Sequence, residues 1–185
     1  MRLIEGNFLK YQDALVRAIK LGKIFIYPTD TIYGLGADAT NAKAVGRIRE
    51  LKHRETKPFL VAAPSLEWIW ENCEVPVLAR PEIEKNLPGR FAYFLKLKNR
   101  NSLTYNKVNP LGDGTLGVRF FDHAFQKVIS AAGVPFVTTS VNLGANPHSE
   151  TLEEMPPSIK EGVDYIIYEG RLAGPTSQKI DLTEF

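Results

Sequence analysis

The sequence predicts an α/β fold built on an open, largely parallel or mixed sheet with helices on its faces. Short runs of β-branched and aromatic residues alternate with amphipathic stretches along much of the chain. Polar loops follow several of these runs directly. In open α/β sheets the ligand site lies in the crevice beyond the carboxyl ends of the strands. We therefore expect a binding cleft formed by the loops over residues 28–40, 51–58 and 138–151.

The spacing of apolar residues assigns the individual elements. Helical spacing predicts helices over residues 12–21, 42–52 and 122–132. Short apolar runs predict strands over residues 24–27, 58–62, 91–97, 115–120, 135–138, 165–168 and 179–182. The pair Pro156-Pro157 is expected to break the segment that follows it.

Glycines and polar capping residues mark several of the predicted helix ends. Gly22 and Gly133 directly follow helical patterns and are expected to stop them. Asn41 is suited to cap the second helix, because its side chain can accept a hydrogen bond from the first turn. Ser65 is suited in the same way to begin a helix whose two tryptophans we expect to pack against the core.

Length and composition indicate one globular domain over residues 1–185. The single cysteine, Cys73, excludes an intrachain disulfide, and three histidines without metal-ligand spacing exclude a typical zinc site. No apolar run approaches the roughly 20 residues that span a bilayer, and the start lacks a signal-peptide pattern. We therefore expect a soluble, cytoplasmic protein that does not contact membranes.

The net charge of the chain limits the class of ligand that we expect it to bind. A formal net charge of +2 is only mildly basic, whereas dedicated nucleic-acid binders carry a stronger excess. A local basic cleft for an anionic small molecule fits the same balance.

The loop Pro28–Gly36 combines two hydroxyls, one carboxylate and two glycines directly after a predicted strand. Hydroxyls can hold the polar groups of a substrate, and glycines let backbone amides approach it. An ordinary turn-rich loop is an equal alternative on these residues alone. Asp30 could reach a metal-bound phosphate or simply cap the loop, and the segment is not a nucleotide P-loop.

A basic segment, residues 52–57, follows the second predicted helix. Its three cations could neutralise a triphosphate, with Arg54 giving a forked contact. On charge alone a solvated helix end is favoured, because cations suit the carboxyl end of a helix.

Two further groups of polar residues lie at predicted strand ends. Arg119 ends an apolar segment and needs an anionic partner, which could be a substrate carboxylate or an aspartate of the chain such as Asp122. Residues 138–142 place four polar side chains after a strand, which suits a binding floor or a capping turn. His123 and His148 are expected to be surface or capping residues rather than metal ligands.

The ordered set of motifs resembles the YrdC family of threonylcarbamoyl-adenylate synthases, in its short single-domain branch. The match runs from about residue 12 to residue 183 and rests on Pro28–Gly36, Lys52-x-Arg54 with Lys57-Pro58, Pro88-Gly89, Val118-Arg119 with Asp122-His123, Thr139–Leu143, and Ser177 with Ile180-Asp181-Leu182. The basic segment is one residue shorter than the family pattern and lacks its proline. Other departures from the usual residues are Arg90, Ala92, Val141 and Ala62.

The resemblance implies a twisted sheet with a deep basic cavity. It implies a nucleotidyltransferase that joins L-threonine, bicarbonate and ATP into threonylcarbamoyl-AMP and pyrophosphate, the first step of threonylcarbamoyl-adenosine modification of tRNA. Magnesium would arrive with ATP, held by phosphates and water rather than by a carboxylate cage. The product would pass to a tRNA-modifying threonylcarbamoyl transferase complex.

The resemblance also assigns residues to each substrate. L-Threonine would be held by Thr29, Arg119, Thr138 and Ser177, with Lys57 able to serve either side. ATP would be held by Lys52, Arg54, Thr115, Ser140, Asn142, His148 and Ser149. No covalent nucleophile is needed, so catalysis would consist of positioning by Lys52, Arg54 and Arg119.

Three alternatives remain open on the sequence. The chain could be a double-stranded RNA or tRNA-binding module, and RNA binding could also coexist with the enzyme. It could be a homologue that binds nucleotide without turnover. A carbamoyltransferase of hydrogenase maturation is the third, although such chains are longer and carry further domains.

Overall fold

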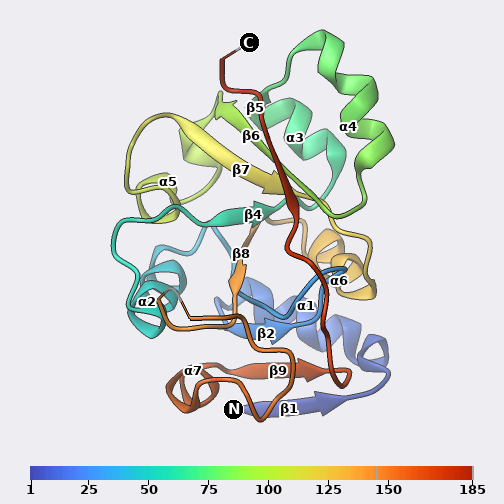
Figure 1. The fold of residues 1–185 in the computed structure, drawn as a ribbon, viewed down its shortest axis with the longest axis vertical. Coiled ribbons are helices and arrows are strands. Elements are labelled where there is room, and N and C mark those ends of the chain that lie inside the picture. The colour runs from blue at the N-terminus through green and yellow to red at the C-terminus, as the bar shows by residue number, and fades with distance from the viewer. Residues whose placement is uncertain (145, 185) are drawn as a thin grey trace.

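The computed structural model describes residues 1–144 and 146–184. Within them the strands form one mixed sheet in the order β1-β9-β2-β3-β8-β4-β7-β6-β10, and β5 pairs with β6 off this path (Figure 1). The strands are β1 (Arg2–Glu5), β2 (Phe25–Tyr27), β3 (Gly34–Gly36), β4 (Leu60–Ala62), β5 (Cys73–Glu74), β6 (Phe91–Leu97), β7 (Thr115–Arg119), β8 (Phe136–Ser140), β9 (Tyr165–Tyr168) and β10 (Gln178–Asp181). The predicted α/β class and open sheet are confirmed.

Parallel and antiparallel pairs are interleaved, so the sheet is mixed rather than largely parallel. β9 pairs in parallel with β1 and β2, β4 with β7, and β6 with β10. The pairs around β3 and β8 are antiparallel, as are β6 with β7 and β5 with β6. The helices are α1 (Gln12–Lys20), α2 (Ala42–Lys52), α3 (Leu66–Asn72), α4 (Arg80–Asn86), α5 (Tyr105–Val108), α6 (Ala124–Ala132) and α7 (Pro157–Gly162).

Several predicted helix ends are confirmed by their hydrogen bonds. The Asn41 side chain accepts from the Ala44 amide at 3.0 Å, and Ser65 Oγ accepts from the Trp68 amide at 3.1 Å. Gly133 ends α6 at φ +70°, in the left-handed region that glycine adopts freely. His123 caps the start of α6, where its Nδ1 accepts from the Phe125 amide at 3.1 Å.

Two sequence predictions were wrong in position. Residues 34–36 lie in the predicted loop over residues 28–40, yet they form β3, because β2 and β8 pair with the segment from both sides. Pro156-Pro157 was expected to break the following segment, but Pro157 begins α7. A proline lacks an amide hydrogen that the first helical turn does not use, so it suits that position. The sequence patterns also missed β1, β5, α4 and α5.

Two hydrophobic clusters hold the sheet. In one, α1 and α6 pack side by side against β2 and β8, around an aromatic group in which Tyr27 stacks on Phe125 at 4.6 Å between ring centroids. The other runs through β4, β6 and β7 under α2, α3 and α5. None of the described helices is long and apolar enough to cross a membrane.

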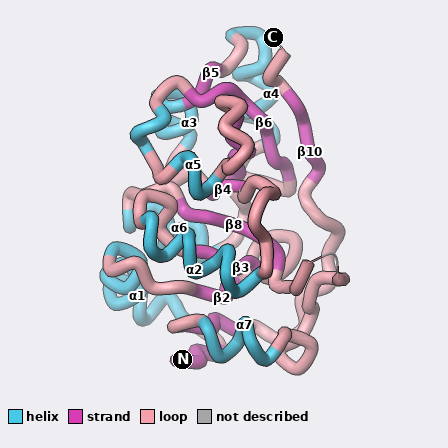
Figure 2. Tube along the Cα trace, turned by 90° about the vertical axis from the view of Figure 1, so that its left-hand side faces the viewer, coloured by secondary structure: helices cyan, strands magenta, loops and turns pink. Residues whose placement is uncertain are grey.

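The carboxyl-terminal segment, residues 169–184, connects β9, next to one end of the sheet, with β10 at the other end. After β9 the chain runs along one side of the molecule to β10 beside β6, so β1 and β10 lie at opposite ends of the molecule (Figures 1 and 2). Tyr33 Oη donates to the Gly170 carbonyl at 2.6 Å. A Cβ at Gly174 would overlap the Thr31 carbonyl oxygen, so this segment lies tightly against the loop that follows β2.

Gly36→Ala is expected to lower the free energy of unfolding by about 2–3 kcal/mol, because a Cβ there would overlap the backbone carbonyl of Val137. Gly46→Ala in α2 is the matched control. Its Cβ would meet only the flexible end of Lys107 at 3.3 Å, and helix propensity should stabilise it by up to about 1 kcal/mol. Urea unfolding of both variants measures the difference, and equal stabilities would contradict the close approach of β3 and β8.

Candidate functional site

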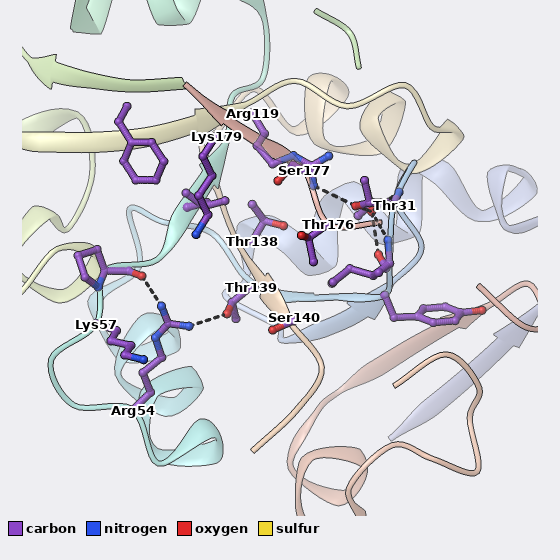
Figure 3. A pocket seen from close by; sticks show the side chains of 17 residues that line it. Thr31, Arg54, Lys57, Arg119, Thr138, Thr139, Ser140, Thr176, Ser177 and Lys179 are labelled. Carbon is purple, nitrogen blue, oxygen red and sulfur yellow. Dashed lines mark hydrogen bonds between the residues drawn. The ribbon is translucent and has the colours of Figure 1, made fainter. Parts of the chain in front are cut away.

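A pocket of about 400 Å³ lies where the polar loops of the sheet meet the carboxyl-terminal segment (Figure 3). All three loops predicted to form the cleft contribute to its lining. They supply Thr29, Thr31, Ile32, Tyr33, Gly34, Arg54, Lys57, Pro58, Thr138, Thr139 and Ser140. The other lining residues are Leu60 of β4, Phe94 of β6, Arg119 of β7, and Thr176, Ser177 and Lys179 from the carboxyl-terminal segment.

The loop after β2 presents two buried hydroxyls to the pocket. Thr29 Oγ1 donates to the Ile32 carbonyl at 2.7 Å and accepts from the Thr31 amide at 3.1 Å. The two threonine hydroxyls lie 3.0 Å apart. This local hydrogen-bonded turn explains why the loop has a defined shape, and it holds two hydroxyl oxygens at the wall of the pocket.

Arg119 enters the pocket from the end of β7 and is held by Asp30. Their ion pair measures 2.6 Å, with the two side chains 5% and 6% exposed. The sequence suggested Asp122 as one partner, and this was wrong, because only the Asp122 backbone amide reaches the pair, donating to Asp30 Oδ2 at 3.1 Å. Among the described residues, Arg119 Nε is buried without an acceptor. The guanidinium therefore retains a donor beyond those that the protein satisfies.

Arg54 lies at the other side of the pocket. It donates to the Pro58 carbonyl at 2.7 Å and to Thr139 Oγ1 at 3.3 Å, and its Nε has no acceptor within the described part of the chain. Burial lowers its pKa from the ordinary arginine value. Arg49, which the sequence did not single out, donates to the carbonyls of residues 54, 55 and 57 and so shapes this basic loop.

Lys52 is buried behind the pocket rather than in its lining. Its ammonium donates to the Ser140 carbonyl and, at 2.9 and 2.8 Å, to the carbonyl and side-chain oxygens of Asn142. Burial, followed by the charge of Arg54, lowers the pKa of Lys52 from 10.5 to about 7. Lys52 thus holds the turn that carries Ser140, and its direct contact with ATP stays a prediction.

The pocket contains only some of the substrate-binding residues that the family resemblance predicted. Thr29, Arg54, Lys57, Arg119, Thr138, Ser140 and Ser177 line the pocket. Asn142, Thr115, His148 and Ser149 do not. Thr115 Oγ1 donates to Asp113 at 2.8 Å, and Ser149 Oγ is buried on the Val141 carbonyl at 2.9 Å. Their proposed contacts with ATP stay predictions.

The pocket is positively charged in its side chains. Its described lining contains Arg54, Lys57, Arg119 and Lys179 and no carboxylate. Such a set favours an anionic ligand. Within the described residues no group of three or more histidine, cysteine, aspartate or glutamate side chains could hold a metal ion.

The sequence missed Thr31, Thr139, Thr176 and Lys179 as lining residues. Thr139 and Thr176 adjoin predicted residues and Thr31 lies two positions from Thr29, so the motifs marked the right segments. Lys179 had no such signal beyond its place in the last predicted strand, because only the pairing of that strand with β6 brings it to the pocket.

The fold and the pocket define an α/β protein with a cavity suited to an anionic ligand. A family model described as "Telomere recombination", covering Sua5, YciO and YrdC, matches residues 17–184. The chain belongs to this Sua5, YciO and YrdC family.

Individual relatives agree with the family. A provisionally named threonylcarbamoyl-AMP synthase of Methanocaldococcus jannaschii is 32% identical over 170 residues, covering 91% of this chain and 78% of that protein. The threonylcarbamoyl-AMP synthase of Bos taurus is 31% identical over 153 residues, covering 80% of this chain and 53% of that protein.

A solved relative links the fold to a ligand. The crystal structure of P. abyssi Sua5 complexed with L-threonine superposes with a TM-score of 0.84 at 25% identity, over 98% of this chain and 54% of that one. The chain therefore spans about half the length of this Sua5 and of the Bos taurus relative.

Proposed function

We propose that the protein is an L-threonylcarbamoyladenylate synthase, a nucleotidyltransferase that converts L-threonine, bicarbonate and ATP into threonylcarbamoyl-AMP and pyrophosphate. The observation that carries the proposal is the layout of the pocket, in which buried threonine hydroxyls beside Arg119 share one cavity with Arg54 and Lys57. The names of the relatives, and the complex of P. abyssi Sua5 with L-threonine, support the same substrates.

In the proposed reaction the threonine amine attacks bicarbonate, and water is lost to give a carbamate. A carbamate oxygen then forms a bond to the α-phosphorus of ATP, and the bond from that phosphorus to the bridging oxygen breaks as pyrophosphate leaves. No side chain has to act as a nucleophile. The only cysteine, Cys73, is buried, and burial raises its pKa to about 12, so its thiol stays protonated.

Thr29, Thr138 and Ser177 would position the amino acid, with Arg119 on its carboxylate. Asp30 holds one side of the Arg119 guanidinium, and the buried Nε is left for the substrate. A buried donor without an acceptor costs about 1–3 kcal/mol, so a carboxylate that took up this hydrogen would remove that cost on binding.

Arg54, Lys57 and Ser140 would position the nucleotide, and the cations would offset negative charge on the phosphates as pyrophosphate leaves. The carboxylate-free lining suits magnesium that is carried by ATP and held by phosphates and water. When bound, magnesium would neutralise phosphate charge. The product would serve a tRNA-modifying transferase complex in the cytoplasm.

The proposal is tested by pyrophosphate release from ATP with threonine or bicarbonate omitted in turn. Release is expected to require both, because the carbamate is the attacking group. Detection of threonylcarbamoyl-AMP by mass spectrometry confirms that the pyrophosphate comes from this reaction. No threonine-dependent release at any magnesium concentration, together with salt-sensitive binding of tRNA, would instead favour an RNA-binding module.

A further inference from the structure

Lys179 lines the pocket, and its side chain has no hydrogen-bond or ion-pair partner among the described residues. It lies in β10, pairs across the sheet with Ala92 of β6, and is exposed. Figure 3 shows its side chain between Arg119 and Arg54, at the height of Thr138. The ammonium thus faces the middle of the cavity, between the hydroxyl-rich side and the basic loop.

The nearby carboxylates are already engaged elsewhere. Asp30 is paired with Arg119, and Asp181, two residues along β10, accepts from the amide and the hydroxyl of Thr183 at 2.9 and 2.7 Å. Among the described residues no ion pair forms with Lys179. When the cavity holds no anion, the positive charges of Arg54 and Arg119 repel the ammonium of Lys179. A bound anion between these cations would reverse the sign of that interaction.

The two arginines and Lys179 differ in how they are held. Arg54 and Arg119 donate to protein acceptors, which fixes their guanidinium groups in the cavity wall. Lys179 has a flexible stem and no such acceptor in the described part of the chain, so its ammonium can follow a ligand. A lysine on an edge strand can also serve merely to prevent pairing with another strand, and this is the alternative that a test has to separate.

We propose that Lys179 binds the phosphate chain of the nucleotide directly, at a point between the threonine hydroxyls of the pocket and Arg54. That the ligand is a nucleotide rests on the proposed function. That Lys179 forms part of an anion site does not depend on it. Lys179 supplies a mobile cation to the cavity. Lys52 does not, because its ammonium is buried and donates to the turn over residues 140–142.

The test compares Lys179→Met with Lys96→Met. Lys96 is an exposed lysine on the adjacent strand β6 and does not line the pocket, so both variants remove one strand lysine and one charge. Binding of inorganic triphosphate is measured by calorimetry, and steady-state pyrophosphate release gives the KM values for ATP and threonine. Lys179→Met is expected to weaken triphosphate binding and raise the KM for ATP by roughly 10-fold, as for one charge-assisted hydrogen bond.

Lys96→Met should match the wild type, Lys179→Arg should recover most of the affinity, and the KM for threonine should stay unchanged. Unaltered triphosphate affinity in Lys179→Met would overturn the proposal, as would equal losses in both methionine variants or a change confined to the KM for threonine. If the wild type makes no threonylcarbamoyl-AMP but Lys179→Met alone loses triphosphate affinity, the anion site stands and the proposed reaction fails.

Discussion

Arg119→Met is expected to lower the free energy of unfolding by about 3–5 kcal/mol and threonine-dependent pyrophosphate release by about 100-fold or more. The stability loss follows because Asp30, only 6% exposed in its side chain, would be left buried without its counter-charge. The activity loss follows because Arg119 is the cation beside the threonine hydroxyls of the pocket. For a chain of this length the melting temperature should fall by about 6–20 °C.

A double variant separates the two effects. Asp30→Asn in the Arg119→Met background removes the uncompensated charge, so most of the lost stability should return. Activity should not return, since the guanidinium is still missing. Thermal unfolding without ligands and pyrophosphate release with saturating ATP measure the two quantities. Unchanged stability in the single variant would contradict the buried ion pair, and recovered activity in the double variant would contradict the substrate role of Arg119.

Lys52→Met is expected to destabilise the protein by about 3 kcal/mol at pH 8.5, because it leaves three partly buried oxygens of Ser140 and Asn142 without their donor. The turn that carries Ser140 into the pocket would lose its anchor. Pyrophosphate release should therefore fall by about 10-fold or more even under conditions where the variant stays folded.

The destabilisation by Lys52→Met should shrink as the pH falls. The pKa of Lys52 is about 7 in the folded protein and 10.5 ordinarily, so between these values the unfolded chain binds more protons and stability rises with pH. The wild type should gain roughly 1.5 kcal/mol from this group between pH 7 and pH 8.5, and the variant should not. Cys73 and the tyrosines are common to both proteins, so their titration cancels in the difference.

Urea unfolding of both proteins at several pH values measures this difference. Lys43→Met on the same helix is the control, since Lys43 is exposed and should show a difference from the wild type that is independent of pH. A constant gap between Lys52→Met and the wild type across the range would show that Lys52 keeps an ordinary pKa in the folded protein.

Local patterns were sufficient for the elements whose ends depend on neighbouring residues. Asn41 and Ser65 cap helices as predicted, because a capping bond joins residues three positions apart. β3 shows the limit of such patterns. Its glycines have little intrinsic preference for a strand, and the segment becomes one because strands on both sides pair with it.

The sequence by itself determined the α/β class, the family resemblance and the three loops that line the pocket, since periodicity, caps and motif order are properties of local segments. Tertiary structure alone decided the partners inside the site. Arg119 pairs with Asp30, 89 residues away in the sequence. Lys52 donates to the turn over residues 140–142 and does not line the cavity. Lys179 reaches the pocket only because β10 pairs with β6. These contacts depend on which distant segments pack together, so the sequence next to each side chain does not predict them.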